Sequence, residues 1–346
     1  MKARVGKFVS AVFNWLKREL YWMVLPWLLL GALWSSGAFF RAFDAPLTVA
    51  VIAVFSLWML LLSSVFFRRA TLAVVWLELA TVAAFCRITP EQRFRDTVWQ
   101  KPWSRTLEAK RLADGRYELR NVRDFHYRSE HDFDVDYRTV IVDPEQISSI
   151  DAVFSHWDNL EGIAHSMLGL NFADGTTVVI SLETRLPEGV EQNGLDGFYR
   201  RYGLAMIAGT PEDLYGLRVD HRGETLYVYR LRANHEYMRR LTLSLFERAE
   251  ELRKKPEYYN SLFRNCTTGL LPLLPDADKT PANDIRLLLN GMADNMLFEQ
   301  SLIVCRKDES FGSLRSRSLV PGLCRGKNAP PERYRGESEA RWVRDR

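Results

Sequence analysis

Three apolar stretches in the first quarter of this chain constrain its fold more than any other feature. Residues 21–40 carry no charge and are long enough, at about 1.5 Å per residue, to cross a hydrocarbon core of about 30 Å. Residues 47–67 form a second charge-free stretch, and residues 70–86 form a third that is shorter and contains Glu78. The sequence therefore predicts a transmembrane region over residues 21–86.

The third stretch decides on which side of the membrane the rest of the chain lies. A glutamate at the bilayer centre costs roughly 2.5–3.5 kcal/mol on insertion scales, and a helix that faces other helices can carry it. Arg68 and Arg69 suit a tight cytoplasmic turn before this stretch, which favours three spans over two. We interpret Glu78 as a residue that faces the other helices rather than as a catalytic group.

The basic residues near the apolar stretches set the orientation. Residues 1–20 contain several lysines and arginines, which predicts a basic, cytoplasmic N-terminus. Three spans then place everything after Cys86 outside the cytoplasmic membrane, whereas two spans would leave the domain in the cytoplasm.

Charge and cysteine usage exclude several classes of function. The 47 Lys and Arg nearly balance the 43 Asp and Glu, and no long basic block occurs, so nucleic acid is not an expected partner. The four cysteines have neither CxxC nor zinc-finger spacing. We expect no metal site and no cofactor.

After residue 86 the pattern changes to that of a globular domain. Residues 87–117 are predicted to be a connector, residues 118–324 the catalytic domain, and residues 325–346 a charged, disordered tail. Strands are predicted over residues 118–127, 137–142, 148–157, 162–172, 177–185 and 225–231, and an amphipathic helix over residues 235–254. The fold class is α+β: transmembrane helices followed by a mainly antiparallel sheet and a helical C-terminal half.

Cys266 is the candidate nucleophile. In the segment FRNCTTGLLPLL, Asn265 has the side chain of a good N-cap, and a helix beginning there would place the thiol at its N-terminus. A helix N-terminus lowers a thiol pKa, and its free N–H groups can bind an acyl oxyanion. The alternative is that Cys266 is a small buried residue without chemistry.

His165 is the candidate general base, because it lies in an apolar strand where a sheet would hold its ring rigidly. The loop Ala173–Gly175 is a typical hairpin connection that pairs Phe172 with Thr176. This register places His165 opposite Glu183, which could orient the imidazole as the third member of a triad. A slip of one residue would move Glu183 to the other face, and a lone strand histidine can also be an ordinary core residue.

Three segments together carry a family resemblance. Residues 121–137 (NVRDFHYRSEHDFDVDY), 163–185 (IAHSMLGLNFADGTTVVISLETR) and 256–270 (PEYYNSLFRNCTTGL) resemble the periplasmic domain of the Lnb-type lipoprotein N-acyltransferases. The resemblance implies a permuted papain-like layout in which the histidine precedes the cysteine. It implies Cys266 as nucleophile, His165 as base and Glu183 as its orienting partner.

Four further residues are candidates for binding substrate. Arg185 follows Glu183 on the same face and could hold an anionic headgroup, although an ion pair with a neighbouring acid is the simpler reading. Tyr127 and Arg128 could form a pocket wall, with a solvated surface as the alternative. Asn265, beside the candidate nucleophile, completes the set.

Together these features predict a multi-pass protein of the bacterial inner membrane with a periplasmic catalytic domain. The resemblance implies a thiol acyltransferase that takes an acyl group from a membrane phospholipid and passes it to a lipoprotein or other amine. One alternative is a thiol hydrolase, such as a lipase, thioesterase or cell-wall amidase, in which water replaces the amine. Another is a non-catalytic ligand-binding module.

An oxidising compartment also favours pairing of available thiols. Cys305 and Cys324 flank a polar segment with few core residues. We therefore expect these two cysteines to form a disulfide and Cys266 to stay free.

Overall fold

The computed structural model describes residues 2–64, 68–157, 162–261, 263–275, 284, 286 and 290–321. The chain divides into two compact units: Met1–Arg95 with Tyr199–Arg201, and Asp96–Phe198 with Tyr202–Arg346. The predicted disordered tail, residues 325–346, and the last three residues of the second apolar stretch lie outside the described residues.

The membrane unit consists of the long helices α1 (Lys2–Arg41), α2 (Leu47–Ser64) and α3 (Arg68–Arg87), followed by the short α4 (Pro90–Arg93). Three segments are long and apolar enough to cross a membrane: Trp22–Arg41, Leu47–Ser64 and Ala70–Arg87. This confirms the predicted three spans. Glu78 of α3 packs against Gly31 of α1, where a Cβ would not fit, in agreement with its interpretation as a residue that faces another helix.

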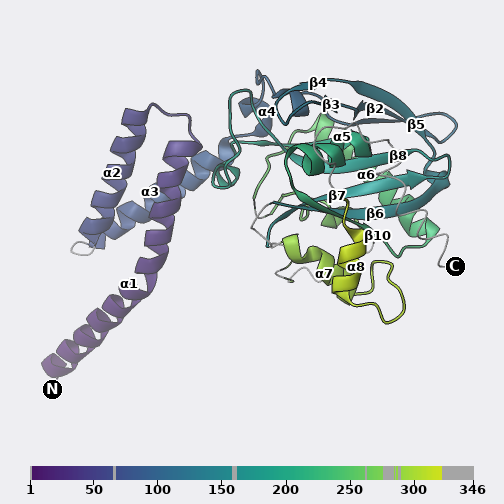
Figure 1. The fold of residues 1–346 in the computed structure, drawn as a ribbon. Coiled ribbons are helices and arrows are strands. Elements are labelled where there is room, and N and C mark those ends of the chain that lie inside the picture. The colour runs from purple at the N-terminus through teal and green to yellow at the C-terminus, as the bar shows by residue number, and fades with distance from the viewer. Residues whose placement is uncertain are drawn as a thin grey trace. The chain divides into compact units, whose positions relative to one another are not determined.

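The second unit contains a mixed sheet, and this confirms the predicted α+β class (Figure 1). The strands run in the order β1-β2-β9-β8-β7-β6-β10, with β5 also paired to β2. Their bounds are β1 Glu108–Arg111, β2 Tyr117–Arg123, β5 Tyr137–Val142, β6 Ile147–His156, β7 Ala164–Phe172, β8 Thr177–Arg185, β9 Gly203–Gly209 and β10 Thr225–Arg230. Neighbours are antiparallel except β2 and β9, which are parallel. β3 (His126–Tyr127) and β4 (Phe133–Asp134) form a separate two-stranded ladder.

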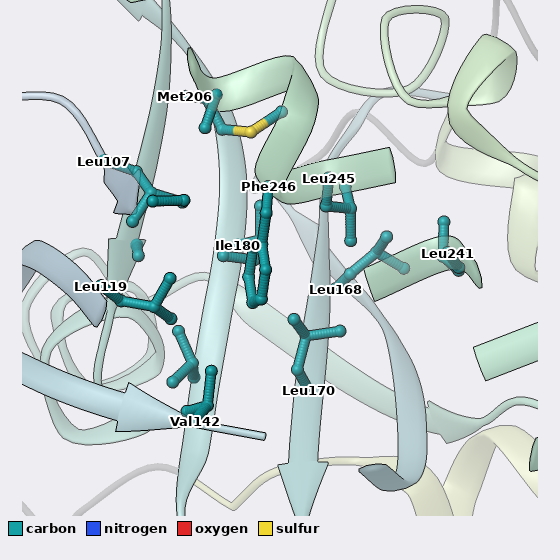
Figure 2. Close-up of a cluster of buried hydrophobic side chains, with 14 of the residues drawn as sticks. Leu107, Leu119, Val142, Leu168, Leu170, Ile180, Met206, Leu241, Leu245 and Phe246 are labelled. Carbon is teal, nitrogen blue, oxygen red and sulfur yellow. The ribbon is translucent and has the colours of Figure 1, made fainter. Parts of the chain in front are cut away.

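Helix α6 (His235–Lys254) covers one face of the sheet, over the range that its amphipathic pattern predicts. Asn234 caps it, since its side chain accepts a hydrogen bond from the backbone N–H of Tyr237. Figure 2 shows the resulting core, in which Leu241, Leu245 and Phe246 of α6 lie against apolar side chains from the strands, all buried.

The other face is covered by α5 (Pro211–Gly216) and the π-helix η4 (Leu217–His221), neither of which the periodicity predicts. Leu214 and Tyr215 of α5 pack on Met167 and Val179 from the middle strands, all buried. Because both faces are covered, β7 and β8 are buried almost throughout instead of alternating between buried and exposed residues. Strand β9 is also uniformly buried, which explains why its sequence GLAMIAG carries no alternation signal.

Near the C-terminus, α7 (Ala293–Glu299) and α8 (Phe311–Ser318) pack beside β6 and β10. Cys305, between them, has a free thiol. Cys324, the second cysteine of the expected disulfide, lies outside the described residues.

Candidate active site

The loop that carries Cys266 is a single capped turn, not the start of the long helix that the sequence predicted. Asn265 Oδ1 accepts hydrogen bonds from the backbone N–H groups of Thr267 (2.9 Å) and Thr268 (2.8 Å), as an N-cap side chain does. The turn leads into the short 3-10 helix η5 (Leu271–Leu273) instead of an α-helix, because Pro272 lacks an N–H and disfavours α-helical geometry before it. The capping prediction is confirmed, and the helix prediction is wrong.

The hairpin register brings His165 and Glu183 together as predicted. Strands β7 and β8 pair Met167 with Ser181 and Asn171 with Thr177, and continuing this register places His165 opposite Glu183. His165 Nε2 lies 3.1 Å from Glu183 Oε1. Odd-numbered residues of both strands share one face of the sheet, so the two side chains meet without distortion.

Ser181 lies between these two side chains and is fully buried. Its hydroxyl is 2.7 Å from His165 Nε2 and donates a 2.7 Å hydrogen bond to Glu183 Oε1. Because the hydroxyl proton points to the carboxylate, the Ser181 oxygen can accept the Nε2 proton of His165. In that arrangement Nε2 keeps its proton, and Nδ1 is the ring nitrogen that can gain or lose one.

A buried arginine holds Glu183 from the other side. Arg218, in the π-helix η4, donates a 2.9 Å hydrogen bond from Nη2 to Glu183 Oε1 and another of 2.9 Å from Nη1 to the carbonyl of Leu214. Glu224 lies 3.9 Å from Arg218 Nε, so the arginine sits between two carboxylates. A π-turn displaces side chains from helical positions, which is a recurring feature of functional sites.

The charges of this cluster favour a thiolate and an imidazolium. Burial favours the neutral imidazole, but the negative charges of Glu183 and Cys266 outweigh it and raise the pKa of His165 to about 9. Burial likewise disfavours ionisation of Glu183 and Cys266, yet His165 lowers the pKa of Cys266, and His165 with Arg218 holds the pKa of Glu183 well below its usual range. His165 and Cys266 each favour the charged form of the other, so the two groups can form a thiolate–imidazolium pair.

Cys266 and His165 open onto a pocket of about 530 Å³. Its wall combines aromatic and aliphatic side chains with a few amide and hydroxyl groups. The apolar members are Trp103, Trp157, Ile163, Ala164, Leu182, Tyr202 and Tyr259, and the polar members include Thr184, Gln192, Asn193, Ser261 and Asn265. A mostly apolar pocket with convergent polar groups and groups of shifted pKa has the composition of a small-molecule or acyl-chain site.

The other predicted binding residues have different surroundings. Asn265 lines the pocket. Arg185 is held by the carbonyls of Trp103 and Ser104 (2.9 Å each) and stacks on the ring of Trp99, and burial lowers the pKa of its guanidinium to about 10. Arg185 therefore stabilises the backbone at Trp103 and Ser104. The sequence favoured an acidic side chain as its partner, and the structure shows backbone carbonyl groups instead.

Tyr127 and Arg128 do not line this pocket. The Tyr127 hydroxyl accepts a 2.6 Å hydrogen bond from Arg123 and donates to Asp213. Arg128 is exposed and forms ion pairs with Asp132 and Asp134 (2.6 Å each), as the solvated-surface alternative expects.

Sequence reasoning missed Ser181 and Arg218. The alternation that selected Glu183 also places Ser181 on the same face two residues earlier, so Ser181 carried a usable signal. No sequence signal indicated Arg218, because its position depends on a π-turn that the spacing of apolar residues does not predict.

One cluster of potential metal ligands occurs in the described part of the chain, away from this pocket. Ligand atoms of Asp124, His126 and Asp136 lie within 4.8 Å of one another. Asp124 is already engaged, since Thr210 donates to one of its carboxylate oxygens (2.8 Å) and Arg138 pairs with the other. We assign no metal to this cluster.

The charge state of the pair predicts how the thiol reacts with pH. The pKa of Cys266 lies below the ordinary thiol value of about 8.5, and His165 should stay protonated up to about pH 9. The ion pair therefore exists from the lowered pKa of Cys266 up to about pH 9. We expect iodoacetamide to alkylate Cys266 rapidly at neutral pH in the full-length protein. In His165→Ala the half-maximal rate should move to pH 8.5 or above, since burial and the negative charge of Glu183 then raise the thiol pKa and only the backbone hydrogen bond of Ser166 still lowers it.

The measurement is quantitative mass spectrometry of the Cys266 peptide after timed alkylation between pH 5 and pH 10. Superimposable pH profiles for the wild-type protein and His165→Ala would contradict the ion pair.

Comparison with known proteins finds a family match for part of the chain. No curated protein and no solved structure matches the chain. A family model does match residues 133–291, a range that includes His165, Glu183 and Cys266. This segment of the chain is similar to the Lnb N-terminal periplasmic domain.

Proposed function

We propose that the protein is a membrane-bound thiol acyltransferase, with Cys266 as nucleophile, His165 as general acid and base, and Glu183 as the residue that orients His165. The observation that carries this proposal is a cysteine and a histidine at the wall of one mostly apolar pocket, with a buried carboxylate 3.1 Å from the histidine ring. A periplasmic domain attached to three candidate membrane spans meets lipid acyl groups at a membrane surface.

In the first step the Cys266 thiolate attacks the carbonyl carbon of a lipid ester. The tetrahedral intermediate collapses as the C–O bond breaks, and the His165 imidazolium gives its proton to the departing alkoxide. The products are an acyl thioester on Cys266 and a lyso-lipid alcohol. Neutral His165 remains, held in its tautomer by Ser181 and Glu183.

In the second step an uncharged amine attacks the thioester carbonyl. His165 takes the proton that the amine loses, the C–S bond breaks, and the Cys266 thiolate is restored beside an imidazolium. The net reaction converts an ester and an amine to an amide and an alcohol. A lipoprotein N-terminus is the acceptor that we propose, and a membrane phospholipid is the donor.

Product analysis tests the proposal against hydrolysis by the same thiol. Full-length protein in vesicles of phospholipid with labelled acyl chains receives a lipopeptide with a free N-terminal amine. We expect the label to move to the peptide as an amide that resists hydroxylamine. Label found only as free fatty acid would make the enzyme a hydrolase, and unchanged phospholipid would contradict both activities.

A further inference from the structure

Large apolar side chains stand exposed on loops around the mouth of the Cys266 pocket. The exposed fractions are 57% for Leu195, 75% for Phe263, 42% for Trp157 and 38% for Ile163. We call these four residues the rim. Single exposed apolar residues are common on proteins, but a group of large ones beside a pocket is typical of an interaction surface.

Leu195 is presented by a braced loop. Its backbone N–H donates to Asn193 Oδ1 (2.8 Å), and the backbone N–H of Asn193 donates to the hydroxyl of Tyr202 (2.7 Å), a fully buried residue. Because these bonds fix the backbone that leads into Leu195, its exposure is a property of the fold.

Phe263 is presented by a second braced turn. Its backbone N–H donates to Asn260 Oδ1 (3.0 Å), and the backbones of Asn260 and Arg264 pair with each other across the turn. Ser261 of this turn donates a 2.9 Å hydrogen bond to the carbonyl of Gly194, which ties it to the loop of Leu195.

The rim belongs to the pocket that contains the thiol. Trp157 and Ile163 line the pocket directly, as do Gly194 and Ser261, which carry the loops of the other two rim residues. A ligand that covers the rim is therefore continuous with a ligand inside the pocket.

The same chain contains three candidate membrane spans, and a lipid bilayer is the apolar environment that such a rim needs. Leu195 precedes by four residues the segment Tyr199–Arg201, which belongs to the membrane unit. In that unit Arg200 donates hydrogen bonds to the carbonyls of Phe85 (2.7 Å) and Ile88 (3.0 Å), at the end of the third span. The rim loop is thus continuous in the chain with a segment bound to the end of a membrane helix.

We propose that the rim enters the interface of a lipid bilayer and opens the Cys266 pocket directly to lipid acyl chains. Exposed Trp, Phe, Leu and Ile side chains on short loops partition favourably into this interface. An acyl chain can then pass from bilayer to pocket without crossing water. The docking surface does not depend on the acyl-transfer proposal, because it rests on exposure, bracing and chain connectivity.

Fluorescence quenching tests the surface without catalysis. In the full-length protein with its four cysteines replaced by serine, Phe263→Cys carries an environment-sensitive fluorophore, and the protein is placed in vesicles with brominated acyl chains. We expect a blue-shifted emission that these lipids quench. The matched control is Ile141→Cys on strand β5, which is exposed to 46% but does not line the pocket, and its label should not be quenched.

A second readout uses the protein with its native cysteines. The double variant Leu195→Ser, Phe263→Ser should lose roughly tenfold or more of its activity on bilayer lipid, since two large apolar side chains no longer enter the interface. It should keep its reaction with a water-soluble short-chain thioester. The control double variant Val135→Ser, Ile141→Ser removes two other exposed apolar residues (47% and 46%) and should change neither reaction.

Equal quenching of the fluorophores at positions 263 and 141 by the brominated lipids would overturn the proposal. So would a blue shift that disappears when the protein is diluted among vesicles, because that result assigns the rim to a second copy of the chain. Lack of all acyl transfer, with position 263 quenched, would reject the proposed function and leave the lipid surface standing.

Discussion

Replacing Cys266 by serine is expected to lower acyl transfer by roughly a thousandfold or more, because a hydroxyl cannot ionise beside His165 as a thiol does. The protein should still insert into the membrane and fold, since serine is close in size to the buried cysteine. His165→Ala should cause a comparable loss. The measurement is the rate of label transfer from phospholipid to an amine acceptor.

The double variant Cys266→Ser, His165→Ala should be no worse than either single variant, because residues that act in one step give non-additive losses. Cys305→Ser is the matched control, since it changes the half-buried thiol between α7 and α8 and should keep full activity. Activity retained in Cys266→Ser would remove the nucleophile from the mechanism.

The largest effect on stability is expected from Asp213→Ala. Asp213 is fully buried and binds the Arg123 guanidinium through both carboxylate oxygens (2.6 and 3.2 Å), and it also accepts the backbone N–H of Phe125 (2.8 Å). Its removal leaves a buried positive charge without a partner, which costs about 3–5 kcal/mol. We expect a clearly lower urea midpoint, measured by pulse proteolysis of the full-length protein in detergent.

Asp132→Ala is the control, because it breaks an ion pair with Arg128 that is more than half exposed and worth at most about 1 kcal/mol. The double variant Arg123→Met, Asp213→Leu should recover much of the lost stability by removing the unpaired charge as well. If Asp213→Ala unfolds at the same urea concentration as Asp132→Ala, the buried pair does not stabilise this face of the sheet.

Local rules were sufficient where one short segment determines the geometry. A three-residue hairpin loop sets the register of β7 and β8, and this alone predicted that His165 meets Glu183. The apolar spacing of residues 235–254 likewise predicted helix α6, and the length and charge of the first three apolar stretches predicted the spans.

Prediction failed where two local signals compete, or where contacts between residues distant in sequence determine the structure. The Asn265 cap formed as expected, but Pro272 stops the helix that a cap normally begins. Strand β9 is buried on both faces and shows no period, and Arg218 reaches Glu183 only because a π-turn places it there. The sequence also contained no sign of the hydrogen bond from Tyr127 to the buried Asp213, which is far away in sequence.

The most direct test of the central claim is the intact mass of the full-length protein after incubation with phospholipid in the absence of any amine. Without an acceptor the thioester should accumulate, and we predict a single adduct with the mass of one acyl chain. The adduct should follow the chain length of the donor lipid, disappear with hydroxylamine and be absent from Cys266→Ser. A protein that gains no acyl mass, or an adduct that persists in Cys266→Ser, would contradict Cys266 as the residue that captures the acyl group.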